Sequence, residues 1–444
     1  MFIEFQVGNF RSFRDIQKFT MQAAPLRTND SGDEEGNVFT NSDFRLLKSK
    51  AIYGSNASGK SNLVDAFSDF HRMVDKSVVQ EEMPKFVWGN TFKLISDWEK
   101  QPIFFQYIFL SAGVVYRYGF QILNDKITYE WLFEGESDSE KEYFMRTPEG
   151  LNINKENFTG TNEFFEQSKK SVNELYRSDS LFLTAAAINS NILAIKLRDE
   201  IRYVAIIDGM KDEAAINFGM HILLSGTDEE KIAIKELLKA ADTGIEDLEL
   251  IDEMNFDFDN HPTSSVKPPQ SLDNIWVKKA STLFSSHVRF NENGKKIDTI
   301  TVPFGKWESS GTAKFFSLSA VILDTLRKKR ILIVDEFDAK LHPNLTLKII
   351  ELFNSPKTNP YNAQIIFVTH DTGLLRRAEL RRDQICIVNK DKYGISTLST
   401  LIEFKGVRKD ASYEKEYLNG NYEGVPYLGE MDNIVTQNFE NNGS

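Results

Sequence analysis

The chain has 444 residues, of which 41% are hydrophobic and 27% are charged, a balance typical of a folded protein with two or three packed units. The formal net charge of −12 argues against a surface that coats nucleic acid as a whole, although a local basic face remains compatible with it. A single cysteine excludes an internal disulfide framework, and neither a signal peptide nor an apolar run of the ~18–20 residues that cross a bilayer is present, so we expect a cytoplasmic chain without a membrane partner.

The N-terminal part is predicted to be rich in β-strands. Apolar and polar residues alternate over 2–7 and again over 16–21, which predicts an opening β-hairpin. Three later runs, 103–110, 114–122 and 127–133, carry aromatic residues at alternate positions. This period is typical of a half-buried antiparallel sheet, so we interpret these aromatics as sheet packing.

Between these strands, residues 54–61 match the phosphate-binding pattern G-x-x-x-x-G-K-[ST]. An apolar strand precedes them and an amphipathic helix follows, which is the context in which such a loop cradles phosphate with backbone N–H groups and a helix N-terminus. In this Walker A loop we expect Lys60 to reach the β- and γ-phosphates of ATP and Ser61 to bind Mg²⁺. The predicted nucleotide-binding residues here are Gly54, Ser55, Asn56, Ala57, Ser58, Gly59, Lys60, Ser61 and Asn62.

The middle of the chain changes to helical spacing. Apolar residues recur at helix repeats from about 162 to 242, without the sustained heptads of a long coiled coil, so we expect a compact helical insertion. Strand patterns return at 248–251 and 299–302. The predicted division is a β-rich N-terminal lobe with Walker A (1–155), the helical insertion (156–245) and a C-terminal lobe (246–444).

Two apolar strands of the C-terminal lobe end in polar residues. Residues 331–334 precede Asp335 and Glu336, the form of a buried parallel strand that delivers carboxylates at its C-terminal edge. We interpret it as a Walker B strand, in which Asp335 holds Mg²⁺ and Glu336 polarises the attacking water. The second strand, 364–368, leads to His370, which on an adjacent strand would hydrogen-bond the γ-phosphate; taken alone, both strand ends are common patterns.

Small polar residues precede the apolar helix predicted over 313–326. Ser309, Ser310 and Gly311 at this helix N-terminus form an anion site by geometry alone. The same residues are also ordinary helix-capping residues, and both interpretations can hold together.

The order of these motifs resembles that of the ABC/SMC-type ATPase head, and differs from the AAA+ ring and the RecA core. The resemblance implies an α/β P-loop fold in which one nucleotide site is split by the insertion between Lys60 and Asp335. It implies that Asp338 lies in a D-loop against a partner head, and that residues 309–311 close over the γ-phosphate of the other protomer. The implied assembly is a homodimer or higher homo-oligomer with composite ATP sites.

Three stretches resemble the RloA/AbiLi group of bacterial ATPases, which belongs with the overcoming-lysogenization-defect and PARIS phage-defence systems. They are 51–63, 240–247, and 404–410 with 425–429. The resemblance implies a slow ATPase that senses an infection cue or DNA and controls a separately encoded, nuclease-like effector in abortive infection. The residues after His370 are too few for the nuclease domain that the overcoming-lysogenization-defect group carries.

The sequence departs from the wider pattern at three points. The signature reads Glu-Ser-Ser-Gly-Thr where transporters have Leu-Ser-Gly-Gly-Gln, and Lys340 stands where a small residue is usual in the D-loop. Two glutamines on candidate strands, Gln106 and Gln121, are alternative Q-loop residues.

Two other functions compete with the defence ATPase. The first is a DNA-repair head that binds duplex ends. A basic cluster favours it, and the negative net charge of the chain and the absence of long coiled-coil arms argue against it. The cluster consists of Arg376, Arg377, Arg381, Arg382, Lys390 and Lys392. We interpret this cluster as a solvated edge or a protein contact. A nucleotide-gated scaffold with very slow turnover is the third possibility.

Overall fold

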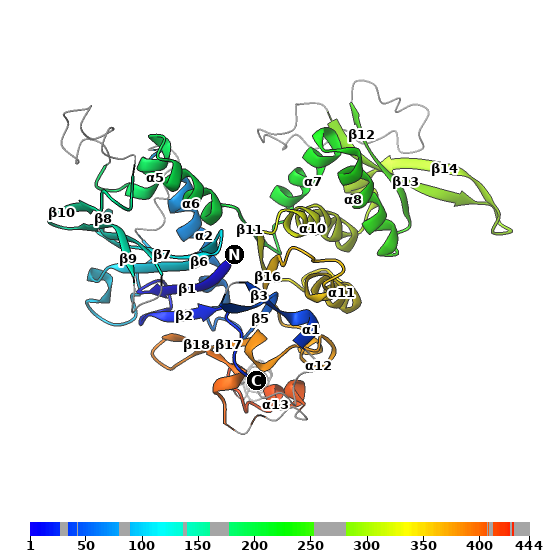
Figure 1. Cartoon of the computed structure of the whole chain (residues 1–444). Helices are drawn as coiled ribbons and strands as arrows, with labels where there is room; N and C mark the ends of the chain where they lie inside the picture. The colour runs from blue at the N-terminus through cyan, green and yellow to red at the C-terminus, as the bar shows by residue number, and fades with distance from the viewer. Residues whose placement is uncertain are drawn as a thin grey trace, which may run out of the picture.

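The computed structural model describes residues 1–26, 34–41, 43–79, 89–135, 140–159, 177–252, 281–405, 407, 412–426 and 429 (Figure 1). The start of the predicted helical insertion, and parts of the stretches 404–410 and 425–429, lie outside these residues. The described chain has a mixed α/β architecture, with the Walker A loop between a parallel strand and a helix.

A six-stranded sheet places the motif-bearing strands side by side. In spatial order its strands are β11 (Val204–Asp208), β15 (Ile331–Asp335), β16 (Gln364–Val368), β5 (Ser49–Tyr53), β17 (Ile385–Lys390) and β18 (Ser396–Thr400). All neighbours are parallel except β17 and β18. Because β16 lies between the Walker B strand β15 and the Walker A strand β5, the residues that follow these three strands meet at one sheet edge.

The predicted β-rich part forms a separate, seven-stranded antiparallel sheet. Its spatial order is β10 (Gly150–Ile153), β9 (Lys141–Thr147), β8 (Lys126–Glu134), β7 (Val114–Leu123), β6 (Ile103–Ser111), β1 (Phe2–Gly8) and β2 (Gln17–Thr20). The opening hairpin and the three aromatic strands are therefore confirmed as β1–β2 and β6–β8.

Helix α2 (Lys60–Lys76) is packed between the two sheets. Its Phe67 ring stacks on Phe5 with centroids 4.2 Å apart, and its Phe70 ring stacks on Tyr107 at 5.3 Å. The same apolar core includes Ile333 of the Walker B strand. The aromatic alternation of the antiparallel sheet thus serves to anchor the helix that begins at the phosphate loop.

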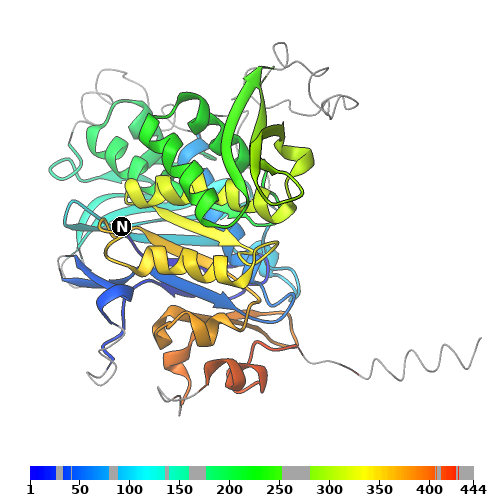
Figure 2. The ribbon, with the colours of Figure 1, turned by 90° about the vertical axis from the view of Figure 1, so that its right-hand side faces the viewer.

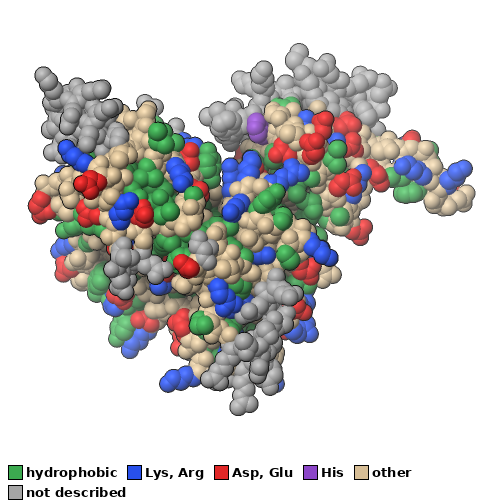
Figure 3. All heavy atoms as spheres, in the orientation of Figure 1, with side chains coloured by type: hydrophobic (Ala, Val, Ile, Leu, Met, Phe, Trp, Pro, Cys, Tyr) green, Lys and Arg blue, Asp and Glu red, His purple; other side chains and the backbone are tan. Residues whose placement is uncertain are grey.

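The opposite face of the parallel sheet is covered by α10 (Ser310–Arg327) and α11 (Pro343–Asn354), which lie along it in Figure 2. A smaller lobe packs on α10 and contains α7 (Glu213–Ser225), α8 (Asp228–Ala240), α9 (Phe304–Trp307) and a sheet of β12 (Ile245–Asp252), β13 (Ser281–Phe290) and β14 (Lys296–Pro303). The β13–β14 hairpin projects from this lobe and carries side chains of both charges (Figure 3).

The structure differs from the single helical insertion predicted over 156–245. Helices α5 (Phe182–Ile188) and α6 (Ile192–Arg202) pack on α2, whereas α7 and α8 pack on α10. Between the two pairs, β11 joins the central sheet beside β15. A five-residue apolar run has no periodicity that separates a buried strand from part of a helix, so the sequence pattern did not reveal this strand.

The remaining described elements are short. They are α1 (Glu34–Asn37), β3 (Val38–Asn41), β4 (Phe44–Leu47), α12 (Leu374–Arg377), α13 (Tyr413–Leu418) and the 3₁₀ turns Trp98–Lys100, Arg382–Gln384 and Leu401–Glu403. Among the described helices, none has the length and apolar character needed to span a bilayer.

His71 on α2 gives the fold a predictable pH dependence. Its ring lies among Phe67, Phe70 and Tyr107, and burial lowers its pKa to about 3. In the unfolded chain His71 is protonated below about pH 6.5, whereas in the folded chain it stays neutral down to about pH 3. The free energy of unfolding therefore decreases as the pH falls from about 6.5 towards 3.

We expect His71→Phe to remove this loss, because a phenyl ring suits the same aromatic surroundings and carries no proton. Relative to the unsubstituted protein, the variant should gain about 2 kcal/mol of unfolding free energy between pH 8 and pH 5. Urea unfolding of both proteins at the two pH values measures this difference. If the unfolding free energies of the two proteins changed equally between pH 8 and pH 5, His71 would not titrate as the structure indicates.

Candidate nucleotide-binding site

A cavity of about 540 Å³ lies at the C-terminal edge of the parallel sheet. The residues that line it come from the Walker A loop, the ends of β15 and β16, and β17: Asn56, Ala57, Ser58, Gly59, Lys60, Ser61, Asn62, Glu336, His370 and Lys390. The structure therefore brings together residues that the sequence placed in three separate motifs.

Two glycines give the Walker A loop its shape. Gly54 has φ +154° and Gly59, the residue before α2, has φ +114°, values that other residues adopt only with strain. A Cβ at Gly54 would lie 2.4 Å from the Val388 carbonyl oxygen, and one at Gly59 would lie 2.5 Å from the Ser396 hydroxyl oxygen. A side chain at Gly54 would push against the β17 backbone, and one at Gly59 would displace the Ser396 and Ser12 hydroxyls.

Residues distant in sequence hold the loop in place. The Ser396 hydroxyl of β18 donates to the Ser58 carbonyl (2.5 Å), and the Ser396 N–H donates to the Ser12 carbonyl (2.8 Å). The Asn62 amide donates to the Ser12 hydroxyl (2.7 Å). Asn62, predicted to bind nucleotide, thus lines the cavity while its amide group bonds the turn after β1. Ser12 and Ser396 belong to no sequence motif, so their roles could not be predicted from the sequence.

The Lys60 ammonium lies inside the loop. Its Nζ donates to the carbonyl oxygens of Gly54 and Ser55, each at 2.9 Å. Burial lowers the pKa of Lys60, and the carboxylates of Glu336 and Asp335 act in the opposite direction. The Lys60 ammonium is therefore placed where it would contact an anionic ligand bound in the loop.

Asp335 and Ser61 form a pair of oxygen groups at the end of β15. The Ser61 hydroxyl hydrogen-bonds the Asp335 carboxyl, whose pKa is raised by burial and lowered in part by this bond and by the Glu336 N–H. A half-buried carboxylate next to a hydroxyl fits Mg²⁺, which prefers oxygen ligands and takes the rest from phosphates and water. In the described part of the chain, no cluster of three or more His, Cys, Asp or Glu side chains could hold a metal by itself.

Glu336 and His370 face each other across the cavity. Glu336 has φ +47°, and its Oε1 lies 4.0 Å from His370 Nε2. The Phe337 N–H donates to the Val368 carbonyl (2.9 Å), and the His370 N–H donates to Asp338 Oδ1 (3.1 Å). These two bonds, one between backbone groups and one to the Asp338 carboxylate, fix the turn after β15 against the turn after β16 and so position the predicted catalytic pair.

The signature residues lie outside this cavity. Ser309 caps α10 by accepting from the Thr312 N–H (3.1 Å), and Ser309 and Ser310 are exposed. A Cβ at Gly311 would lie 2.8 Å from the Lys340 carbonyl oxygen. Within one chain the signature therefore contacts the D-loop, and Asp338, which also does not line the cavity, reaches it through His370.

The residue before the signature is held by β13. Glu308 Oε1 accepts from the Ser285 hydroxyl (2.5 Å) and lies 2.7 Å from His287 Nε2, while His287 Nδ1 lies 3.0 Å from the Gly244 carbonyl oxygen. Gly244 belongs to the stretch 240–247 that resembles the RloA/AbiLi group. The structure thus places this stretch beside the signature, a role that sequence reasoning missed.

Comparison with known proteins identifies the domain. The family model described as "AAA domain, putative AbiEii toxin, Type IV TA system" matches residues 51–376, a range that includes the Walker A, signature, Walker B and His370 positions. The chain belongs to this AAA family. No curated protein matches the chain. Among solved structures, the SMC head domain from Thermotoga maritima is similar at 11% identity and a TM-score of 0.39, over 90% of this chain and 98% of that chain.

Neither candidate Q-loop glutamine lines the cavity of this AAA domain. The Gln106 side-chain oxygen accepts from Arg117 (3.1 Å) and from the Trp131 indole N–H (3.2 Å) within the antiparallel sheet. Both glutamines lie on strands of that sheet, β6 and β7, and the choice between them stays a prediction.

The basic cluster predicted from the sequence is divided among internal partners. Arg376 pairs with Glu414, Arg377 with Asp371 and Arg381 with Asp383, and Arg382 donates to the Val407 carbonyl. Lys392 lies over the Tyr393 ring, and Lys390 lines the cavity that holds the Walker A residues. The cluster is thus held mainly by contacts within the chain, and Lys390 belongs to the site, which sequence reasoning missed.

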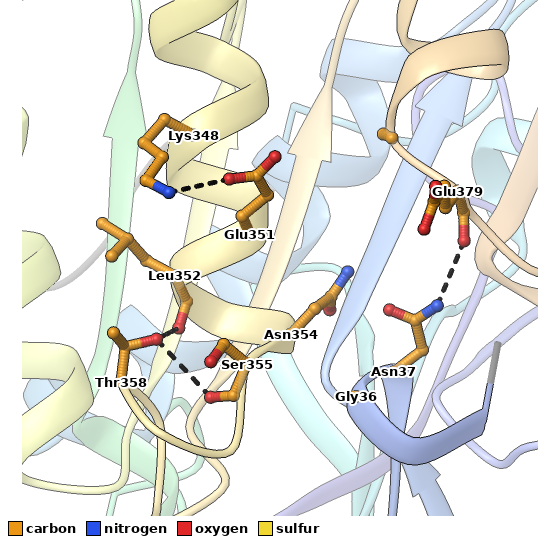
Figure 4. A pocket seen from close by; sticks show the side chains of 10 residues that line it. Gly36, Asn37, Lys348, Glu351, Leu352, Asn354, Ser355, Thr358 and Glu379 are labelled. Atoms are coloured by element: carbon orange, nitrogen blue, oxygen red, sulfur yellow. Dashed lines mark hydrogen bonds and ion pairs between the residues drawn. The ribbon is translucent and has the colours of Figure 1, made fainter. Parts of the chain in front are cut away.

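A second cavity, of about 430 Å³, lies between α11, α1 and residues 378–379 (Figure 4). Its polar groups bond one another: Lys348 pairs with Glu351, and the Asn37 amide donates to the Glu379 carbonyl. None of the predicted nucleotide-binding residues lines it.

Proposed function

We propose that this AAA domain binds and slowly hydrolyses Mg·ATP in the cavity at the sheet edge. The observation that carries the proposal is the convergence of Lys60, Ser61, Glu336 and His370 on one cavity. Lys60 and the loop N–H groups bind the phosphates, Ser61 and Asp335 hold the metal, and Lys390 adds positive charge at the rim. Bound Mg²⁺ supplies neutralisation of the charge that develops on the phosphates.

The two residues that face each other have distinct proposed roles. Glu336 accepts the proton of the attacking water, because its carboxylate enters the cavity opposite the phosphate loop. His370 hydrogen-bonds the γ-phosphate, and its position depends on Asp338. Both roles need only the groups that the structure brings together.

The site is completed, in this proposal, by a second copy of the chain. Ser309, Ser310 and Gly311 stand exposed or half-buried beside the D-loop and away from the cavity of their own chain. Association of two heads across each other's nucleotide would give these residues a γ-phosphate to contact. The functional unit is then a nucleotide-dependent homodimer or higher homo-oligomer.

We further propose that the chain acts in the cytoplasm as the sensor or regulator of an anti-phage, abortive-infection system, and controls a separately encoded effector through head association. The family description, which names a putative AbiEii toxin, and the resemblance to the RloA/AbiLi group support this role. The DNA-end-binding alternative is less favoured, because the arginines that suggested it are engaged within the chain.

Light scattering tests the composite site. With Mg²⁺ and a non-hydrolysable ATP analogue, we expect the molar mass to rise from the chain's 50.9 kDa to twice that value. Ser310→Arg should bind the analogue and remain monomeric, because Ser310 is exposed in the monomer and would be covered in the dimer. An unchanged mass for the unsubstituted protein would contradict the composite site.

The regulatory role has its own test. Co-purification of the product of a neighbouring gene, in a manner that changes with nucleotide, is the result expected of an effector-controlling ATPase. Tight, salt-dependent binding of DNA ends without such a partner would instead favour the repair-type head.

A further inference from the structure

The turn between β11 and α7, residues 209–212, contacts three motifs at once. The Asp212 carboxylate accepts from two lysines: Lys314 Nζ lies 3.0 Å from Oδ1, and Lys340 Nζ lies 3.0 Å from Oδ2. Lys314 belongs to α10, the helix that begins at the signature, and Lys340 belongs to the D-loop. One carboxylate therefore joins two elements that no sequence motif connects to it.

The two lysines differ in how firmly they are held. The Lys314 side chain is fully buried and also donates to the Gly209 carbonyl (3.0 Å), whereas the Lys340 side chain is 33% exposed. A buried ammonium needs a paired anion, so Lys314 and Asp212 form a fixed unit. Lys340 is the partner that can be removed without leaving a buried charge.

The same turn touches the catalytic strand through its backbone. The Gly209 N–H donates to the Asp335 carbonyl (2.8 Å), and a Cβ at Gly209 would lie 2.3 Å from the Glu336 carbonyl oxygen. On the other side, the Lys340 carbonyl contacts Gly311 of the signature. The end of the Walker B strand, the D-loop and the signature helix are thus linked through residues 209–212.

We propose that Asp212 is a positioning residue, which holds the signature helix through Lys314 and the D-loop through Lys340 in register with Glu336. The proposal rests on the ATPase function proposed above. It explains why a lysine occupies a D-loop position where a small residue is usual: its ammonium is the tether to Asp212. Because Asp338 of the same loop supports the His370 backbone, loosening the tether displaces His370 relative to Glu336.

Lys340→Met is the decisive variant, since it removes the ammonium, keeps the aliphatic stem and leaves the buried Lys314–Asp212 pair intact. Small displacements of catalytic groups are costly, so we expect kcat for ATP to fall roughly tenfold. KM should stay within about twofold, since Lys340 does not line the cavity. Lys211→Met is the matched control: Lys211 lies in the same turn, is 84% exposed and pairs with Asp208. It should leave kcat unchanged.

A second pair of variants separates positioning from stability. Asp212→Asn leaves the Lys314 ammonium buried without its anion and should lower the unfolding temperature. The double variant Asp212→Asn with Lys314→Met removes that buried charge, so its unfolding temperature should recover. Its kcat should stay low, as in Lys340→Met, because Lys340 still lacks its carboxylate partner. A double variant with full kcat, or a Lys340→Met protein equal to the control, would overturn the proposal. If the unsubstituted chain neither binds nor hydrolyses ATP, the proposed function itself fails instead.

Discussion

Replacement of Lys60 by alanine is expected to lower the affinity for Mg·ATP by at least about 100-fold, since charge-assisted hydrogen bonds to two phosphates are each worth about 1.5–3 kcal/mol. In the structure the Lys60 ammonium already lies in the loop on the Gly54 and Ser55 carbonyls. Its removal also leaves the Asp335 and Glu336 carboxylates without the nearby cation, which makes the cavity less favourable for an anionic ligand. Titration calorimetry with Mg·ATP measures the change.

Lys390→Ala provides a matched control for this prediction. Lys390 lines the same cavity from β17 but lies outside the phosphate loop, so its loss should weaken binding by about tenfold at most. Thermal unfolding of both variants checks that α2 remains packed between the sheets. Retention of affinity within threefold by Lys60→Ala would show that the loop does not bind phosphate as proposed.

The strands that carry the motifs were predictable because each is a short apolar run that ends in a distinctive polar residue. Residues 331–335 and 364–368 form β15 and β16 as expected, and the aromatic alternation in the N-terminal part forms β6–β8. The apolar run alone does not separate a buried strand from part of a helix, so the motif residues at its end are what identified each strand. The parallel edge that gathers the site follows from the same reasoning.

The features that could not be predicted from the sequence depend on contacts between residues that are distant in the chain. β11 became the edge strand beside β15 because a parallel partner was available there, and its own apolar run shows no such preference. Ser396 bonds Ser58 of the loop from 338 positions away, Ser12 bonds Asn62 from 50 positions away, and Gly209 abuts the end of β15. No spacing rule announces such pairs.

Charge patterns were the least informative signal. The run from Arg376 to Lys392 reads as one basic cluster, yet its members point to different partners: Arg381 to the buried Asp383, Arg376 to Glu414, and Lys390 to the nucleotide cavity. Linear clustering of charge therefore does not define a surface, because the partner of each side chain is set by tertiary packing.

Replacement of Glu336 by glutamine is expected to lower kcat by about 10²–10⁴-fold while Mg·ATP binding is retained, the range that removal of a general base gives. Glutamine has the same shape and keeps the backbone conformation that the turn requires, but its amide cannot accept the proton of the attacking water. Lys60, Ser61 and Asp335 still hold the nucleotide. Phosphate release at saturating Mg·ATP, together with calorimetric binding, separates the two effects.

This variant also joins the catalytic and assembly proposals. If two heads close over bound ATP and hydrolysis opens them, Glu336→Gln should keep the doubled mass in Mg·ATP for as long as ATP persists, whereas the unsubstituted protein returns to the monomer mass. Asp335→Asn is the matched control, because it removes a metal ligand and should weaken Mg²⁺-dependent binding itself. Equal loss of binding in Lys60→Ala and Glu336→Gln would contradict the separate roles assigned to these residues. If Glu336→Gln hydrolysed ATP at nearly the normal rate, another residue would have to be the general base. The proposed role of Glu336 in opening the ATP-bound dimer would then also fail.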